Sequence, residues 1–389
     1  MLELAKIARD IDSLGRERAE SLSELPEQLR QADAVVSEIC RDLDGARKRI
    51  SAARTSWLTT TFDEPPNRDY DFPNVPARHA VVAVDGSQVM PDRHEVTLCY
   101  LLNVAGVILY YGIGERPVAG TAPKLCYRDE DLFEEPYGGR RVPVNDKLLA
   151  MRRTLAESAE LESAIRAAKA SGIPVVALWD GSLIRWALEN EPPDYKQRAL
   201  DEYLRAFDVA MELGVPIAGY ISDPGSKDFV NSMRIMLCHK GEVKCDNYGY
   251  AECRTKECDA VARLKDSHVF SKRLAGGKRS VLFTSSSTIL EKYREHRVRA
   301  FYMDAGKEIV RIEVPEWVAA DRELLDLTHA VCCDQAQKGR GYPVALAEAH
   351  EHAVVRSQER NAFYEMIERS FIKHGARLSR SFKRISKGY

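Results

Sequence analysis

Two aspartates stand in the same local setting. Asp85 follows the apolar run AVVAV, Asp180 follows VVALW, and each is followed by Gly and Ser. Such apolar runs predict buried strands, so each carboxylate should emerge where a strand ends. The glycine that follows lets a ligand or a second backbone approach closely. One Asp-Gly-Ser turn says little, because these residues are common in turns. Two of them favour a pair of catalytic acids.

A long helix is predicted between the two aspartates, over residues 144–172, and it offers a third acid. At about 100° per residue, Glu162 falls near the middle of the apolar face, whereas Glu157 and Glu160 fall outside it. A carboxylate on a buried face is costly unless a cation or a donor compensates it. Glu162 is therefore the candidate, and a structural ion pair with an arginine of the same helix is the alternative. The apolar face is defined by Leu148, Met151, Leu155, Ala159, Leu161, Ile165 and Ala168.

Convergent carboxylates of this kind suit the cleavage of a phosphodiester. Two divalent cations about 4 Å apart can activate the attacking water and stabilise the leaving oxygen, and several acids are needed to hold them. Carboxylate oxygens favour Mg²⁺ or Mn²⁺. An imidazole among the ligands shifts the preference towards Mn²⁺.

The predicted helix over residues 342–371 supplies an imidazole. His350 lies one turn from Leu346 and one turn from Val354, so it should lie on the buried face, and His352 should point elsewhere. A histidine on an apolar face is often only a packing residue, and that alternative stays open. Tyr342 begins the same helix with a hydroxyl that can reach the same cleft.

The elements around these residues predict an α/β fold with an RNase H-like core, a mixed sheet with flanking helices. Strands are expected over 80–88, 95–104 and 106–112 as an antiparallel meander, and the long helix follows them. Two further buried strands, 173–181 and 215–223, are separated by a helix over 197–213. The RNase H-like fold has this order of elements: three antiparallel strands, a helix, a strand, a helix and a strand.

The flanking regions complete the predicted domain organisation. Residues 1–58 form an N-terminal helical arm that Pro26 should divide or kink, and the Pro- and Asp-rich segment 59–79 has the composition of a linker. The arm is either packed on the chain or a dimerising, partner-binding element. The catalytic domain is expected over 80–371, ending in one long C-terminal helix. A basic tail over 372–389 follows it.

The second half of the catalytic domain adds three predicted strands. They run over 280–287, 298–306 and 308–315, and the last two form a tight hairpin around Gly306.

Four cysteines gather in a predicted insertion over about 238–268. Cys238, Cys245, Cys253 and Cys258 are candidates for a structural Zn²⁺ site, although they lack the paired C-x-x-C spacing. Reduced thiols in an insertion are the simpler alternative, because nine cysteines without a secretion signal do not indicate a disulfide scaffold.

The composition sets limits on the class of protein. Lys and Arg number 57 against 59 Asp and Glu, so any affinity for nucleic acid must come from local patches. No apolar run approaches the ~20 residues that span a membrane, which predicts a cytoplasmic protein. The segment LAGGKRS lacks the first glycine and the Ser/Thr of a phosphate-binding loop. We therefore expect no ATPase activity in this chain.

The motifs VVAVDGSQ, LWDGSL and GYPVALAEAHEHAVV, with the acidic helix between the first two, resemble the NurA nucleases. The resemblance runs from about residue 80 to residue 371. It implies an active site of Asp85, Glu162, Asp180, Tyr342 and His350, with Asp85, Glu162, Asp180 and His350 as metal ligands. It also implies Mn²⁺-dependent 5′→3′ exonuclease and single-strand endonuclease activity on DNA. Homodimerisation and work beside a hexameric ATPase called HerA, in DNA end resection and double-strand break repair, follow from the same resemblance.

Two other functions use the same residues. An RNase H-like resolvase or an RNA-cleaving nuclease would need the same acids. A catalytically inactive nucleic-acid-binding subunit is the non-enzymatic alternative, and the intact set of acids argues against it.

Overall fold

The computed structural model describes residues 3–90, 98–137, 140–239, 241–245 and 256–375. The chain divides into two compact units. Unit 1 comprises Met1–Phe72, Ser222–Ser287 and Arg299–Ile312, and unit 2 comprises Pro73–Ile221, Thr288–Val298 and Glu313–Tyr389. The expected division into arm, linker and catalytic domain therefore differs from the compact units, because the first 72 residues pack with two later segments.

Unit 2 contains the sheet that carries the aspartates. Its strands lie in the order β9-β8-β3-β4-β5. β3, β4 and β5 form the antiparallel meander, whereas β3, β8 and β9 run parallel. These directions and this order are those of the RNase H-like fold, as the sequence predicts. The strand bounds are β3 (His79–Val89), β4 (Tyr100–Tyr111), β5 (Val118–Cys126), β8 (Val175–Asp180) and β9 (Ile217–Ile221).

The meander differs in detail from the expected one. The two strands expected over 95–104 and 106–112 are the single strand β4 over the described residues, and β5 is the third strand. Gly106 lies within β4, where a Cβ atom would stand 2.5 Å from Oε1 of Glu160. The glycine thus marks the close approach of a helix and not a turn.

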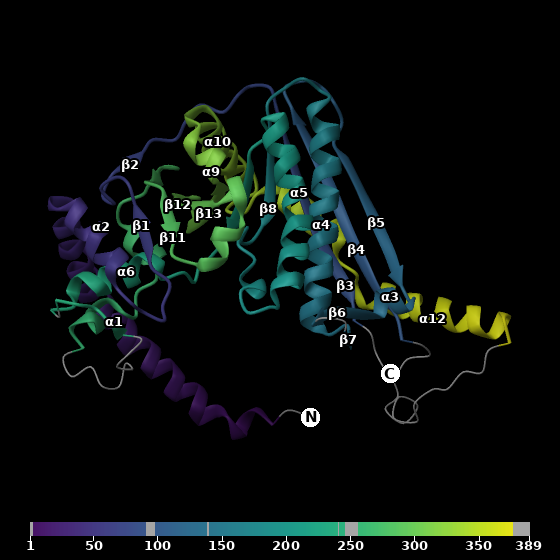
Figure 1. Cartoon of the computed structure of the whole chain (residues 1–389), viewed down its shortest axis with the longest axis horizontal. Helices are drawn as coiled ribbons and strands as arrows, with labels where there is room; N and C mark the ends of the chain where they lie inside the picture. The colour runs from purple at the N-terminus through teal and green to yellow at the C-terminus, as the bar shows by residue number, and fades with distance from the viewer. Residues whose placement is uncertain (1–2, 91–97, 138–139, 240, 246–255, 376–389) are drawn as a thin grey trace. The chain divides into compact units, whose positions relative to one another are not determined.

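Helices α4 (Asp146–Lys169) and α5 (Pro193–Leu213) lie in front of the strands in Figure 1. Their apolar residues pack with alternate residues of β3 and β8, among them Val82, Val84 and Trp179. The other elements of unit 2 are α3 (Asp129–Leu132), β6 (Phe133–Tyr137), β7 (Arg140–Pro143), η2 (Trp186–Leu188), η5 (Thr288–Lys292), η6 (Arg294–His296), α9 (Glu316–Ala320), α10 (Arg322–Lys338), α11 (Val344–Ala353) and α12 (Ser357–Lys373).

The prediction of one long C-terminal helix is wrong. The helix is interrupted at Val354–Arg356: α11 ends at Ala353, and Val354 leaves the helical conformation (φ −58°, ψ 126°). A hydrogen bond caps the start of α12 after this interruption, because the backbone N–H of Arg356 donates to a carboxylate oxygen of Glu359 at 2.7 Å.

Unit 1 has its own core, which is rich in aromatic rings. Phe62, Phe229, Phe270, Phe283 and Tyr302 contact one another with ring centroids 4.6–6.1 Å apart. Its elements are η1 (Leu4–Lys6), α1 (Ala8–Arg41), α2 (Leu43–Ala52), β1 (Thr60–Phe62), β2 (Asp69–Tyr70), α6 (Asp228–Leu237), η4 (Glu257–Val261), α8 (Asp266–Ser271), β10 (Arg279–Ser280) and β11 (Phe283–Ser285). It also contains most of β12 (Val298–Asp304) and part of β13 (Ile309–Pro315).

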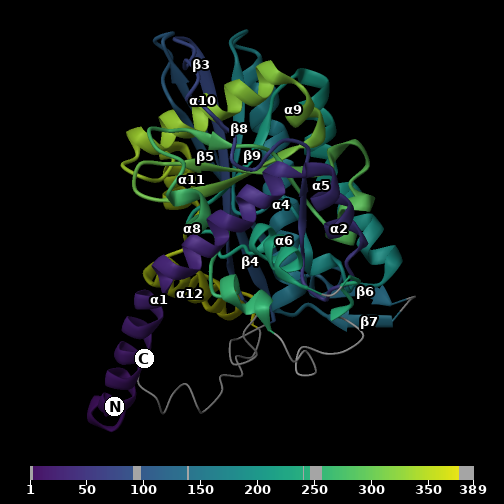
Figure 2. The same cartoon turned by 90° about the vertical axis from the view of Figure 1, so that its left-hand side faces the viewer.

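The N-terminal region corrects two expectations. Pro26 is exposed within the continuous helix α1, and the break comes at Asp42, whose side chain accepts from the N–H of Gly45 at 2.9 Å and caps α2. The expected linker also contains strands, since β1 pairs with β11 and β2 with β10. The second half of α1 is buried in unit 1, whereas its first turns extend beyond the other helices of that unit (Figures 1 and 2). No described helix combines the length and hydrophobicity needed to cross a membrane.

Candidate active site

The two predicted aspartates lie side by side on neighbouring strands of the sheet in unit 2. β3 and β8 run parallel, and their last paired residues are Val84 and Trp179. Asp85 and Asp180 are the next residue on each strand, which brings their carboxylates together. Asp180 ends β8 as predicted, whereas β3 continues past Asp85 to Val89, paired with β4, so the prediction that Asp85 lies at a strand end is wrong. The Asp85 carboxylate raises the pKa of Asp180, and loss of hydration, which is the largest cause, raises it too. The two acids therefore share one electrostatic environment.

Glu157 on α4 is the third carboxylate of this site. It is only 7% exposed, and its Oε1 lies 3.1 Å from Nε of Arg153. Burial raises the pKa of Glu157 to about 7; the negative charges of Asp85 and Asp180 add to this effect, and Arg153 and Arg185 oppose it. A Cβ atom on Gly86 would stand 2.5 Å from this same Oε1. Gly86, which lies within β3, therefore makes room for the Glu157 side chain.

The placement of Glu162 on the buried face was wrong. Its side chain is 29% exposed and forms an ion pair with Arg166 at 3.1 Å. Glu160 is half-buried against Gly106 of β4, and burial alone raises its pKa. By contrast, the charges of Asp85 and Asp180 help to raise the pKa of Glu157.

The prediction for Glu162 is wrong because it defines the buried face of the helix by apolar residues alone. The buried face of α4 also contains Thr154 and Ser158, and Glu157 lies between these two small polar residues. Ala159, which the apolar count included, is exposed. The polar neighbours of Glu157 were the signal that would have found it.

His350 reaches Asp85, although it does not lie on a buried face. Its side chain is 56% exposed, and Nδ1 lies 2.8 Å from Oδ2 of Asp85. The helix α11 that carries it is held at its end, because the carbonyl of Ala353 accepts from Ser87 Oγ at 2.5 Å and from Asn103 Nδ2 at 2.8 Å. The imidazole is therefore placed by contacts at Ala353 and not by an apolar stripe.

Tyr342 completes the set of predicted residues. Its hydroxyl hydrogen-bonds Asp180, and this bond lowers the pKa of Asp180. Burial, together with the neighbouring carboxylates, raises the pKa of Tyr342, so the phenol stays protonated and donates. Its ring meets Tyr220 of β9 edge-on at 5.8 Å.

The donor set fits a hard divalent cation. Asp85, Asp180 and Glu157 offer carboxylate oxygens, which are the ligands of Mg²⁺ and Mn²⁺. Their mutual repulsion raises the pKa values of Asp180 and Glu157, and a bound cation would relieve it. Within the described part of the chain, no three His, Cys, Asp or Glu side chains are already arranged as a metal cluster. The site thus supplies the chemistry of a metal centre without a closed ligand cage.

The cysteine region gives no such fit. Cys238 and Cys245 pack against the apolar core of unit 1, and the neighbouring His239 lies 2.9 Å from a Glu257 carboxylate oxygen. Cys253 lies outside the described residues. The predicted zinc site is therefore not formed by the cysteines that the structure describes.

Comparison with known proteins gives one family. A model of the NurA domain matches residues 79–355. Among solved structures, the chain is similar to the NurA nuclease from Sulfolobus solfataricus, with 15% identity, coverage of 92% of this chain and 98% of that chain, and a TM-score of 0.43. It is also similar to LC9-RNase H1, a type 1 RNase H, with 15% identity over 41% of this chain and 70% of that chain, and a TM-score of 0.19. A search of curated proteins finds no match. Because the matched segment spans most of the chain and contains Asp85, Glu157, Asp180, Tyr342 and His350, the chain belongs to the NurA family of nucleases.

Proposed function

We propose that this protein is a metal-dependent deoxyribonuclease that uses Mn²⁺, with Mg²⁺ as the alternative. The observation that carries the proposal is the placement of Asp85 and Asp180 next to each other on neighbouring strands of unit 2, with Glu157 near enough that both charges raise its pKa. Glu157 takes the place that the sequence assigned to Glu162. When bound at such a site, divalent cations activate water and stabilise the leaving oxygen of a phosphodiester.

The chain's own side chains have separate parts in this proposal. Asp85, Asp180 and Glu157 hold the cations. His350 turns Nδ1 towards Asp85, which leaves Nε2 to bind metal or substrate. Tyr342 orients the Asp180 carboxylate through its hydroxyl. Arg153 and Arg185 place positive charge beside Glu157 and favour its ionised form.

DNA is the proposed substrate, with 5′→3′ exonuclease and single-strand endonuclease activities. Family membership supports this choice. The test incubates the full-length protein with end-labelled single-stranded DNA, duplex DNA and RNA, in Mn²⁺, Mg²⁺ or chelator. Cleavage of DNA that needs the cation supports the proposal. Cleavage of RNA alone would favour an RNA-cleaving enzyme, and binding without cleavage would favour the inactive subunit.

The partners are proposed as a second copy of the chain and a HerA-type hexameric ATPase, in cytoplasmic DNA end resection and double-strand break repair. Exposed Leu and Ile side chains at helical spacing, one just before α1 and the others on its first half, support an interaction through the arm: Ile7, Ile11, Leu14 and Leu22. Such a stripe is typical of helix pairing.

Complex mass and duplex degradation test these partners. The protein is mixed with the ATPase from the same organism, with and without ATP, and compared with a variant in which Ile7, Ile11 and Leu14 are replaced by Ser. We expect a dimer, a complex and ATP-dependent digestion of long duplexes. If no complex forms and ATP has no effect, the nuclease proposal stands and the partnership falls.

A further inference from the structure

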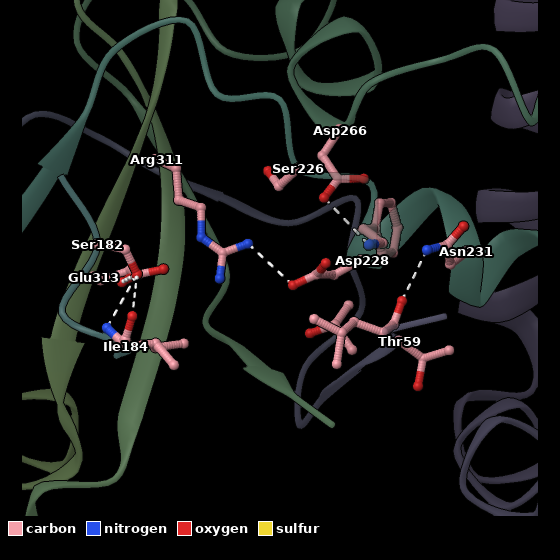
Figure 3. Close-up of polar contacts among 12 residues, drawn as sticks. Thr59, Ser182, Ile184, Ser226, Asp228, Asn231, Asp266, Arg311 and Glu313 are labelled. Carbon is pink, nitrogen blue, oxygen red and sulfur yellow. Dashed lines mark hydrogen bonds and ion pairs between the residues drawn. The ribbon is translucent and has the colours of Figure 1, made fainter. Parts of the chain in front are cut away.

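A buried carboxylate binds two of the residues that follow Asp180, Ser182 and Leu183. Glu313 on β13 is 1% exposed. Its Oε2 accepts from Ser182 Oγ at 2.7 Å and from the N–H of Leu183 at 2.8 Å. The N–H of Ile184 then donates to Ser182 Oγ at 3.0 Å. Figure 3 shows Ser182 and Ile184 gathered at the Glu313 carboxylate.

Two buried tyrosine hydroxyls hold the same segment from other elements. Tyr203 of α5 and Tyr293, the residue before η6, donate to the carbonyl of Leu183 at 3.1 Å and 3.0 Å. The hydroxyl of Tyr293 also accepts from the N–H of Arg185 at 2.7 Å. Burial raises the pKa of Tyr203 to about 12 and that of Tyr293 further, so both phenols stay protonated.

The segment joins two charged groups of the proposed active site. Asp180 stands at its beginning. Arg185 stands at its end, with its guanidinium over the rings of Trp179 at 5.5 Å and Tyr203 at 4.9 Å, and its charge lowers the pKa of Glu157. A shift of the backbone at 181–185 would therefore move a carboxylate and a cation together.

A carboxylate is costly to bury unless donors compensate it. Here the donors of the Gly181–Arg185 segment compensate Glu313, and Glu313 in turn fixes that segment. Groups that orient metal ligands from behind typically change metal affinity or activity about 10- to 100-fold when they are removed.

We infer that Glu313 and Tyr293 are positioning residues, which set Asp180 and Arg185 through the Gly181–Arg185 segment. The inference rests on the proposed nuclease function. It adds two residues, one on β13 and one just before η6, that lie outside the set that the sequence motifs identify.

Three variants test it with small changes in volume: Ser182→Ala, Glu313→Gln and Tyr293→Phe. The matched control is Tyr302→Phe. Tyr302 is also about 1% exposed, and its hydroxyl also makes a short buried bond, to Asp266 of unit 1 at 2.6 Å. The control thus loses a buried tyrosine hydrogen bond in the other unit.

Two readouts are measured on the full-length protein: kcat and KM on labelled single-stranded DNA with Mn²⁺, and hydrogen exchange of the backbone amides at 181–185. We expect each of the three variants to lower kcat about 10- to 100-fold with little change in KM. The Leu183 and Arg185 amides should exchange faster in Tyr293→Phe. Tyr302→Phe should lose thermal stability yet keep wild-type kcat and wild-type exchange at 181–185. Ser182→Thr, which keeps the hydroxyl, should restore most of the activity lost in Ser182→Ala.

Wild-type kcat in both Ser182→Ala and Tyr293→Phe would overturn the inference. An equal fall of kcat in Tyr302→Phe would also overturn it, because the effect would then be general destabilisation. If the wild-type protein cleaves no nucleic acid, the proposed function fails by itself. The exchange rates of Tyr293→Phe and Tyr302→Phe then decide alone whether these residues fix the segment.

Discussion

The Nδ1 atom of His350 lies 2.8 Å from Oδ2 of Asp85, although 265 residues separate them in the chain. The hydroxyl of Ser87, two residues after Asp85, donates to the carbonyl of Ala353, the last residue of the helix that carries His350. The Asp85-Gly86-Ser87 segment of β3 thus supplies an acid, a glycine that admits Glu157, and a serine that anchors the helix of His350. Three consecutive residues of one strand position three of the proposed active-site groups.

His350→Ala should lower cleavage about 10- to 100-fold, because it removes the partner that orients the Asp85 carboxylate. His352→Ala is the matched control, since His352 is exposed on the same helix. Initial rates on single-stranded DNA with saturating Mn²⁺ compare the two. Equal rates would reduce His350 to a surface residue.

Asp85→Ala and Asp180→Ala should each abolish cleavage and leave the fold intact, because each removes a proposed metal ligand and little core volume. Circular dichroism and the melting temperature check the fold, and Asp201→Ala on the exposed side of α5 is the control. Near-normal cleavage by either folded aspartate variant would refute the two-metal site.

Removal of the cation should abolish activity, and its return should stabilise the protein. A ligand at 100 times its Kd adds about 3 kcal/mol to the free energy of unfolding. Addition of Mn²⁺ to chelator-treated protein should therefore raise the melting temperature of the wild type and not that of the Asp85→Ala/Asp180→Ala double variant. An identical rise in both proteins would place the binding elsewhere.

Glu157→Gln should reduce cleavage at least as strongly as His350→Ala, whereas Glu160→Gln and Glu162→Gln should stay near wild type. All three are the same change on one helix, and only Glu157 is coupled to both aspartates. Steady-state rates with purified proteins decide between them. If only Glu162→Gln loses activity, Glu162 is the helix acid, as the sequence predicts, and Glu157 is not.

The stability of unit 1 should depend on pH through Asp266. This carboxylate is fully buried, and burial raises its pKa to about 6, while Asp228 adds to the shift and hydrogen bonds from Tyr302, Val230 and Phe229 oppose it. The folded state therefore holds a proton between pH 4 and 6 that the unfolded chain has released, so stability falls as the pH rises through this window.

A pKa difference of about two units corresponds to about 3 kcal/mol. The stability advantage of wild type over Asp266→Asn should therefore shrink by about that amount between pH 4 and pH 7. Urea unfolding at several pH values, followed by fluorescence, measures it. Asp44→Asn, at an exposed site of unit 1, should show a pH-independent difference. If the stability difference between wild type and Asp266→Asn is also independent of pH, the raised pKa of Asp266 is refuted.

The elements of the sheet were predictable because their signals are local. Apolar runs of five or six residues identified β3, β8 and β9, and the order of elements then indicated an RNase H-like sheet. The parallel register of β3 and β8 followed from that fold, so Asp85 and Asp180 were expected at neighbouring strand ends.

The third acid depended on packing that the sequence does not encode locally. α4 packs against both the sheet and α5, so its buried face includes polar residues that an apolar count omits. The position of His350 also depends on distant residues, because the side chains of Ser87 and Asn103 bind the last carbonyl of its helix, at Ala353.

The sequence by itself determined the sheet, the two aspartates on its neighbouring strands and the family. Each of these follows from neighbouring residues, whose periodicity and turn chemistry act over short distances. Only the tertiary structure decided that Glu157 joins the aspartates, that Gly86 makes room for it, and that Glu313 fixes the segment after Asp180. These are contacts between residues far apart in the chain. Their partners are set by how helices pack on the sheet, because a buried polar group is stable only where distant donors and charges compensate it.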